Sequence, residues 1–219
     1  MPPPARARGP DHCNLNRLNV SWESHLRRRC SMDEAKLKEE LLALLKQKAL
    51  MKGSRTLASG KTSNFYIDGK QVTLDPQGLF LTGKVILNML HGTGASAVGG
   101  PTLGADPIAA AVSLLSSQSG HPLKAFIVRK ESKDHGMQRM IEGPAIEEGD
   151  RVVMVEDVIT TGGSVLKAIH EVEKLKAKVV KVVCLVDRAE GADQVLAGYN
   201  YSPIFSVQDV LAGEFPSKV

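Results

Sequence analysis

Aromatic residues, cysteine and long apolar runs are scarce in this 219-residue chain, and each shortage excludes a class of protein. Phe, Trp and Tyr make up only 4% of the residues, which argues against an RNA-binding protein that stacks bases on aromatic rings. Three cysteines without a C-x-x-C pair form neither a disulfide framework nor a structural zinc site. No stretch approaches the roughly 20 consecutive apolar residues of a membrane span, so we expect no membrane partner.

Excess positive charge is also missing from most of the chain. The net charge of +4 lies in residues 1–31, which hold six Arg and two acidic residues. Residues 32–219 hold the other 22 of the 28 basic residues and the other 22 of the 24 acidic residues, so they are neutral. A neutral body lacks the basic face of a nucleic-acid-binding protein, and we expect no nucleic-acid partner.

Residues 1–31 differ from the rest in composition as well as in charge. They are rich in Arg and Pro, include two of the three Cys and the only Trp, and contain no apolar run of signal-peptide length. Three interpretations stay open: a translated segment upstream of a true start at Met32, an Arg-rich organelle presequence, or a disordered arm. In each case we expect no ordered structure in residues 1–31 and one domain over residues 32–219.

The body alternates between helical and strand patterns. A first helix follows the capping box of Ser31 and Glu34, and its apolar stripe predicts an end near Lys52-Gly53. Asp75-Pro76 predicts the start of a second helix. Apolar runs and helices then alternate: the runs are 65–68, 97–100, 126–128, 152–155, 179–186 and 204–207, and the helices are 76–91, 104–118 and 163–177. This alternation predicts an α/β protein whose parallel sheet is covered by helices on both faces and binds ligands at its carboxyl edge.

The segment 152–164 carries the strongest functional pattern. Four apolar residues predict a buried strand, Glu156 and Asp157 stand at its carboxyl end, and a turn then opens a helix. The turn is made of Thr160, Thr161, Gly162, Gly163 and Ser164. Its backbone N–H groups and the positive helix end suit a phosphate, which the glycines allow to approach closely. The acids would repel phosphate but accept hydrogen bonds from sugar hydroxyls, so the segment predicts a ribose 5-phosphate site. The alternative is a strand end with merely solvated acids.

A basic segment follows the predicted strand 126–128. It places four potential cations within seven residues: Arg129, Lys130, Lys133 and His135. Residues 131–149 are polar, contain Gly and lack a clear pattern, as expected of a mobile lid. Concentrated positive charge suits a pyrophosphate leaving group, whereas Glu131 and Asp134 dilute that charge and leave an exposed structural loop as the alternative.

Two other patterns are excluded. Gly60-Lys61-Thr62 does not form a P-loop, because position 55 is Arg instead of the required Gly. The histidines of the body outside the basic segment lie singly without metal-ligand spacing, so we expect no protein-built metal site. These histidines are His91, His121 and His170.

The chain resembles a known family in several segments. Residues 152–164 are similar to the phosphoribosyl diphosphate (PRPP) signature of type I phosphoribosyltransferases, and residues 33–210 as a whole resemble orotate phosphoribosyltransferases. The narrower resemblance rests on residues 129–136, which are similar to a mobile loop, and on residues 56–68, which are similar to a segment of a small hood. Residues 185–188 resemble a strand end that carries an orotate-contacting arginine.

The sequence also departs from part of this family. Many enterobacterial-type members carry a lysine where Ala58 stands, and another after the Gly-Pro of the first sheet loop, which here is part of residues 100–107. The roles of those lysines therefore do not transfer. The Gly99–Gly104 turn stays a candidate pyrophosphate contact through its backbone N–H groups.

The resemblance implies a type I phosphoribosyltransferase fold. Its parallel sheet core would span residues 85–188, with helices at its flanks, and its hood would combine residues 33–70 with the C-terminal end. The implied activity converts orotate and PRPP to orotidine 5′-monophosphate and diphosphate in pyrimidine biosynthesis. The implied cofactor is Mg²⁺, carried mainly on diphosphate and ribose oxygens. The implied assembly is a cytoplasmic homodimer in which the 129–136 loop serves the neighbouring subunit.

The resemblance also implies roles for individual residues. Lys133 and Asp157 are the expected catalytic residues, and Thr160 and Arg188 are the expected orotate-binding residues. The expected PRPP-binding residues are Arg129, Lys130, Lys133, His135, Glu156, Asp157, Val158, Ile159, Thr160, Thr161, Gly162, Gly163 and Ser164.

Two alternatives stay open at this point. The first is a phosphoribosyltransferase that acts on a purine or on uracil. Arg188 discriminates against it, because a guanidinium pairs with the carboxylate that only orotate carries. The second is a PRPP-sensing regulator on the same fold, which the neutral charge of residues 32–219 disfavours.

Overall fold

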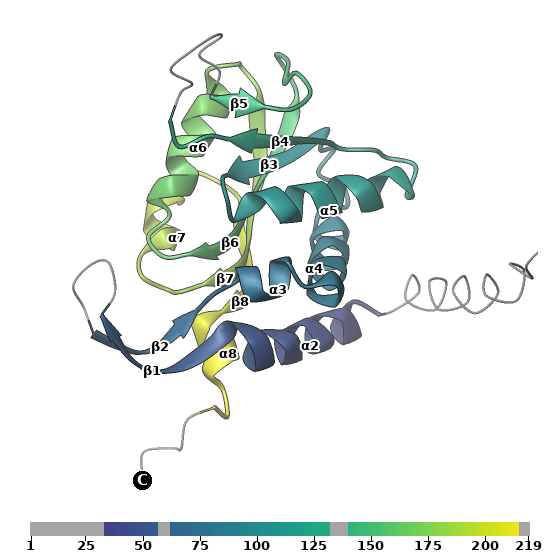
Figure 1. The fold of residues 1–219 in the computed structure, drawn as a ribbon. Helices are drawn as coiled ribbons and strands as arrows, with labels where there is room; N and C mark the ends of the chain where they lie inside the picture. The colour runs from purple at the N-terminus through teal and green to yellow at the C-terminus, as the bar shows by residue number, and fades with distance from the viewer. Residues whose placement is uncertain (1–32, 57–61, 132–139, 215–219) are drawn as a thin grey trace, which may run out of the picture. The chain divides into compact units, whose positions relative to one another are not determined.

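A six-stranded sheet forms the centre of the described structure, a computed structural model that covers residues 33–56, 62–131 and 140–214 (Figure 1). The strand order is β5-β4-β3-β6-β7-β8. The strands are β3 (Ala97–Pro101), β4 (Lys124–Val128), β5 (Ile141–Glu142), β6 (Arg151–Ile159), β7 (Lys178–Asp187) and β8 (Tyr201–Ser206). Neighbours from β4 to β8 pair in parallel, and β5 pairs antiparallel with β4 at one edge. The predicted parallel core is therefore confirmed, with one antiparallel edge strand added. Its predicted end at residue 188 is too early, because β8 also pairs in parallel with β7.

Helices cover both faces of this sheet, as the apolar patterns predict. They are α4 (Pro76–Met89), α5 (Ala105–Ser117), α6 (Gly163–Glu173) and α7 (Ala192–Val195). Successive residues of β6 point to opposite faces. Met154 is buried with Ile169 of α6 in one cluster, whereas Val153 and Val155 are buried with Ile86 of α4 and Ile108 of α5 in the other. The central strand is thus apolar on both faces until it reaches its carboxyl end.

A small layer at one end of the sheet combines the beginning and the end of the described chain (Figure 1). Its elements are α2 (Glu34–Leu44), the π-helix η1 (Leu45–Ala49), β1 (Leu50–Thr56), β2 (Thr62–Ile67), α3 (Lys70–Thr73) and α8 (Val207–Leu211). The Nζ of Lys46 donates to the carbonyl of Ala212 at 2.7 Å. Lys52 pairs with Glu214 at 2.9 Å. We call this layer the hood.

The predicted end of the first helix near Lys52-Gly53 is wrong. The α-helix ends at Leu44, η1 continues to Ala49, and Leu50 begins a strand that pairs antiparallel with β2. The apolar stripe is real, since Leu45 and Ala49 are fully buried. Pairing with a strand that follows later in the chain overrides the local helical pattern after that point. The predicted Ser31 capping box lies outside the described residues.

The helix predicted over 76–91 is confirmed as α4. The side chain of Asp75 caps it by accepting hydrogen bonds from the backbone N–H groups of Gln77 and Gly78 at 3.1 and 2.9 Å. Pro76 occupies the first turn, where its missing N–H costs no hydrogen bond.

The chain reverses its direction across the sheet between β3 and β6. From β3 it crosses α5 to β4 on one side, and it later returns to place β6 on the other side of β3. The loops that follow β3 and β6 therefore diverge and leave a crevice at the carboxyl ends of these strands. This is the edge at which an α/β sheet binds its ligands.

Candidate active site

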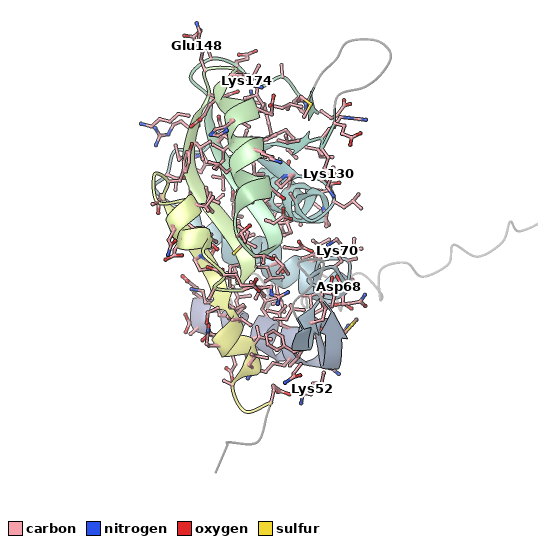
Figure 2. All side chains as sticks on the ribbon, turned by 90° about the vertical axis from the view of Figure 1, so that its left-hand side faces the viewer. Lys52, Asp68, Lys70, Lys130, Glu148 and Lys174 are labelled. Carbon is pink, nitrogen blue, oxygen red and sulfur yellow. The ribbon has the colours of Figure 1, made fainter. Side chains whose placement is uncertain are left out.

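A cavity of about 740 Å³ opens at the carboxyl ends of β3, β4 and β6. Lys70 of α3 and one side of α6 complete its walls, and Figure 2 labels Lys70 and Lys130, which both line it. A smaller cavity of about 120 Å³ adjoins it, since Glu156, Val158 and Ser164 line both. Two connected compartments thus meet at the end of the central strand.

The acid pair at the end of β6 lies where the two cavities adjoin: Glu156 lines both, and Asp157 lines the larger one. Glu156 and Asp157 are the charged side chains among the buried residues of the described chain, with 9% and 4% exposed. The backbone N–H of Asp157 donates to Oε1 of Glu156 at 3.1 Å, and the N–H of Val158 donates to Oδ1 of Asp157 at 2.8 Å. The local backbone therefore holds both carboxylates at the cavity wall.

Gly104 packs directly against these acids. A Cβ at this position would overlap Oε1 of Glu156 and Oδ1 of Asp157, so only glycine fits without displacing a carboxylate. In the sequence this glycine stands in the stretch where other branches of the resembled family carry a lysine. In this chain the loop after β3 therefore contacts the acids through the backbone of a residue that has no side chain.

Burial dominates the acid–base behaviour of Glu156. Loss of water, together with the charge of Asp157 and the hydrogen bonding between the two carboxyl groups, raises the pKa of Glu156 to about 9. Two carboxylates this close resist simultaneous ionisation, so the substrate-free site favours one proton on the pair at neutral pH. A protonated carboxyl group can donate a hydrogen bond as well as accept one.

The smaller cavity is built by the turn between β6 and α6. Thr160, Thr161, Gly162, Gly163 and Ser164 all line it, together with Ile159 and Val165. Gly162 stands at the N-cap of α6 with φ of 83°, a left-handed conformation that favours glycine. Because this N-cap residue has no side chain, the first backbone N–H groups of α6 lack a side-chain cap. The turn therefore forms a small cavity with hydroxyl groups and uncapped backbone N–H groups where the sequence predicts a phosphate site.

Two residues of the predicted basic segment lie at the larger cavity. Arg129 and Lys130 follow β4 and line the larger cavity, which the acid pair lines as well. Arg129 also contacts Glu142 of β5 at 3.4 Å and donates to the carbonyl of Glu131 at 3.2 Å. Lys133 and His135, the other two predicted cations, lie outside the described residues.

Arg188 follows β7 and is not among the residues that line the two cavities. Its backbone N–H donates to the carbonyl of Ile159 at 2.9 Å, which ties it to the end of β6. Its side chain is 9% exposed, pairs with Glu190 at 3.1 Å, and lies 5.8 Å from the ring centre of Phe65 of the hood. The buried Nε has no hydrogen-bond partner among the residues that the structure describes. The guanidinium therefore keeps a donor for a further acceptor.

Lys70 is the site residue that the sequence analysis missed. Its Nζ donates to Oδ2 of Asp157 at 2.8 Å, across 87 positions of the chain. It follows the strand β2 directly after Asp68-Gly69, within the hood range 33–70. A lysine placed right after a turn at a strand end is the signal that could have drawn attention to it.

The described residues contain no group of three or more His, Cys, Asp or Glu side chains that could hold a metal ion. Mg²⁺ usually takes only one or two carboxylates together with substrate phosphates and water. Glu156 and Asp157 supply such a pair at the cavity wall, so these residues fit an ion that arrives with a phosphorylated substrate. In the same part of the chain, no helix is long and apolar enough to cross a lipid bilayer.

Comparison with known proteins identifies relatives along most of the chain. The family model described as "Phosphoribosyl transferase domain" matches residues 41–208. An orotate phosphoribosyltransferase from Nostoc sp. is 43% identical over 180 residues, which cover 81% of this chain and 87% of the relative. One from Thermosynechococcus vestitus is 45% identical over 185 residues, which cover 83% and 97%.

A solved structure agrees with these relatives. The orotate phosphoribosyltransferase of Mycobacterium tuberculosis H37Rv, in complex with PRPP, is 35% identical and superposes with a TM-score of 0.67. The match covers 80% of this chain and 98% of that one.

Proposed function

This chain belongs to the phosphoribosyltransferase family, and from that premise we propose that it is an orotate phosphoribosyltransferase. The reaction joins orotate to the ribose of PRPP and yields orotidine 5′-monophosphate and diphosphate, a step of pyrimidine biosynthesis. One observation carries the proposal at the site. The small cavity at the start of α6 adjoins a pair of buried carboxylates, one of which lines it, and this arrangement suits a ribose 5-phosphate.

The ribose 5-phosphate end of PRPP is assigned to β6 and the turn that follows it. The phosphate would accept hydrogen bonds from the uncapped N–H groups of α6 and from the hydroxyls of Thr160, Thr161 and Ser164. Glu156 and Asp157 would contact the ribose hydroxyls next to it. Val158 and Ile159 connect the two parts and set their spacing along the strand.

The diphosphate end is assigned to the larger cavity. The bond between the anomeric carbon and the diphosphate oxygen breaks, and the diphosphate leaves with the electron pair. Positive charge develops on the ribose ring, which the carboxylates of Glu156 and Asp157 favour, while negative charge collects on the leaving group. Arg129 and Lys130 stand at the wall to neutralise it. We assign the same role to Lys133, as the main catalytic lysine, and to His135.

We propose Mg²⁺ as the cofactor. When bound, the ion supplies charge neutralisation to the diphosphate group. The residues that would hold it are Glu156 and Asp157, and its remaining ligands would be substrate oxygens and water.

The orotate end is assigned to Arg188 and Thr160. A guanidinium presents a planar pair of donors that matches a carboxylate, and the unpartnered Nε of Arg188 leaves a donor for it. Phe65 of the hood lies over the same guanidinium, so the hood closes one side of this subsite. This arrangement favours orotate over a purine or uracil, which lack the carboxylate.

We also propose a homodimer in which residues 129–136 of one subunit serve the active site of the other. Arg129 and Lys130 line the cavity of their own chain, so the exchange concerns the later part of the segment, with Lys133 and His135. The support for this exchange is the resemblance of the segment to the mobile loop of the family.

A spectrophotometric assay tests the proposed function. The full chain is mixed with PRPP and Mg²⁺, and the consumption of orotate is compared with that of adenine and uracil in parallel reactions. We expect turnover with orotate alone. Turnover with adenine or uracil, and none with orotate, would replace the proposed substrate by another base.

A further inference from the structure

Lys70 lies where the hood meets the catalytic acids. It is the first residue of α3 and is labelled in Figure 2. Its Nζ pairs with Asp157, near the end of β6, at 2.8 Å. Asp157 is 6% exposed in its side chain, whereas Lys70 is 43% exposed and lines the larger cavity. The ammonium group thus contacts a buried acid and remains accessible to a ligand in the cavity.

The backbone around Lys70 fixes this arrangement. The N–H of Lys70 donates to Oδ1 of Asp68 at 3.2 Å, which sets the turn before α3. Gly69 packs so closely on β6 that a Cβ would stand 2.9 Å from the Cβ of Asp157. The backbone just before α3 therefore packs against Asp157, and the side chain of Lys70 needs to cross only a short distance to reach its carboxylate.

Acidic side chains surround the ammonium group of Lys70. Asp157 accepts its hydrogen bond, and Asp68 and Glu156 lie near enough to add favourable charge interactions. Without substrate, this ammonium is the side-chain ion-pair partner of Asp157 in the described chain. A buried carboxylate that lacked such a partner would be costly to keep charged.

We propose that Lys70 is a positioning residue that holds the carboxylate of Asp157 in the orientation that meets the ribose hydroxyls of PRPP. The inference deepens the proposed function and rests on it for the identity of the substrate. Lys70 acts through Asp157, so its loss weakens PRPP binding without removing a group that takes part in bond breaking. By its position in α3, it also makes the arrangement of the catalytic acids depend on the hood, which forms the orotate side of the site.

Two variants test the role of the ammonium charge. Lys70→Met keeps most of the length of the side chain and removes the charge, whereas Lys70→Arg keeps the charge. We expect Lys70→Met to raise the Kd and the KM for PRPP about tenfold, the scale of one charge-assisted hydrogen bond, and to change kcat less than about threefold. Lys70→Arg should restore the PRPP affinity to within about threefold of the unmodified chain.

A hood variant provides the matched control. Lys48 of η1 forms an ion pair with Asp75, the residue that caps α4, and does not line either cavity. Lys48→Met removes a lysine charge and an ion pair of the same kind, so it reports any general loosening of the hood. We expect its PRPP affinity to stay unchanged, and thermal denaturation shows that each variant is folded.

A double-mutant cycle separates positioning from direct contact. If Lys70 acts through Asp157, the Lys70→Met/Asp157→Asn double variant binds PRPP no more weakly than Asp157→Asn alone. Additive losses would mean that Lys70 contacts PRPP independently and would overturn the positioning role. An unchanged PRPP affinity in Lys70→Met, or an equal loss in Lys48→Met, would overturn it as well.

The binding measurements are made by calorimetry with PRPP in the absence of orotate. A chain that binds PRPP but does not consume orotate would contradict the proposed substrate, while the comparison of the Lys70 variants would still decide the positioning role. The two failures are therefore distinguishable.

Discussion

At the scale of single residues, the costly feature of this protein is the burial of Glu156 and Asp157 side by side. Burying carboxylates without compensation destabilises a fold, and two neighbours of equal charge add repulsion. Backbone donors, the ammonium of Lys70 and a proton on Glu156 reduce that cost without removing it. Such an arrangement is expected where a substrate, and not the fold, needs the carboxylates.

The first prediction concerns the charge of Asp157. Asp157→Asn keeps the shape of the side chain and loses its charge-assisted bonds to ribose, so we expect the transition state to lose about 1.5–3 kcal/mol of stabilisation. In steady-state kinetics this appears as a lower kcat, with a smaller effect on the melting temperature. Asp193→Asn, a change at an exposed acid of α7, is the control and should keep normal activity. Activity within about twofold of the unmodified chain would exclude Asp157 from the ribose site.

The second prediction concerns Glu156 and pH. The pKa of this group rises from its ordinary value of 4.5 to about 9 on folding, so the folded state keeps a proton that the unfolded state loses. Below pH 4.5 the two states are protonated alike. As the pH rises from there toward 9, the unmodified protein loses stability relative to Glu156→Gln, which cannot ionise.

We therefore expect the substrate-free Glu156→Gln variant to have a higher unfolding free energy than the unmodified chain at pH 8, with a clearly smaller difference at pH 4. Thermal denaturation across this pH range measures the difference. Glu148→Gln, at a side chain that is 71% exposed, serves as the control and should show no such trend. An equal effect of Glu156→Gln at both pH values would contradict a buried, protonated Glu156.

At the scale of elements, the site is made from two kinds of segment. The unit of β6, turn and α6 is continuous in sequence and places carboxylates and phosphate donors at fixed spacing. The loops after β3 and β4 and the helix α3 come from elsewhere and supply Gly104, Arg129 and Lys70. The first kind provides the ribose 5-phosphate end. In the second kind, Gly104 and Lys70 contact its carboxylates, and Arg129 lines the cavity assigned to the diphosphate.

The third prediction concerns the segment after β4. Lys133→Ala should lower kcat by roughly 10²–10³-fold, the scale for removing one preorganised electrostatic group, because its charge is needed mainly as the diphosphate leaves. PRPP binding should suffer less, since the turn at 160–164 still holds the 5-phosphate. Single-turnover kinetics and calorimetry separate these effects. Lys178→Ala, at an exposed lysine that begins β7, is the control. A large loss of PRPP affinity with an unchanged kcat would mean that Lys133 binds the substrate and does not stabilise the leaving diphosphate.

At the scale of the whole molecule, the hood and the sheet core depend on each other. The hood draws on both ends of the described chain, and it contributes Lys70 to the acid pair and Phe65 to the surroundings of Arg188. Ligand sites often lie between such structural units, so the relative position of the hood and the sheet affects the geometry of the site. The proposed homodimer extends this dependence to a second chain.

The fourth prediction tests that dimer by mixing two chains of strongly reduced activity, Lys133→Ala and Asp157→Asn. In a hybrid dimer with exchanged loops, one active site carries both defects and the other carries neither. With random exchange, activity should recover to about a quarter of the normal value, since half of the dimers are hybrids with one intact site. Unmixed chains, each treated identically, are the control. No recovery in samples whose subunit exchange is verified would mean that the loop serves its own subunit.

Two features of this protein follow from the sequence alone. The parallel sheet with helices on both faces is readable because short apolar runs alternate with helical periodicity, a pattern that burial imposes directly on the chain. The acids and the phosphate turn can be predicted because β6, the turn and α6 are contiguous. The types of the functional side chains and their spacing are therefore given directly by residues 152–164.

Only the tertiary structure shows which distant residues contact the acid pair and which strands pair with each other. The chain after Leu50 becomes a strand because residues 62–67 offer hydrogen-bond partners, which no local helical pattern discloses. Lys70 reaches Asp157 across 87 positions, and Gly104 leaves room for both carboxylates, because the fold brings α3 and the loop after β3 to the end of β6. Contacts between segments distant in sequence depend on packing, and packing is determined by the whole fold and not by any one segment of it.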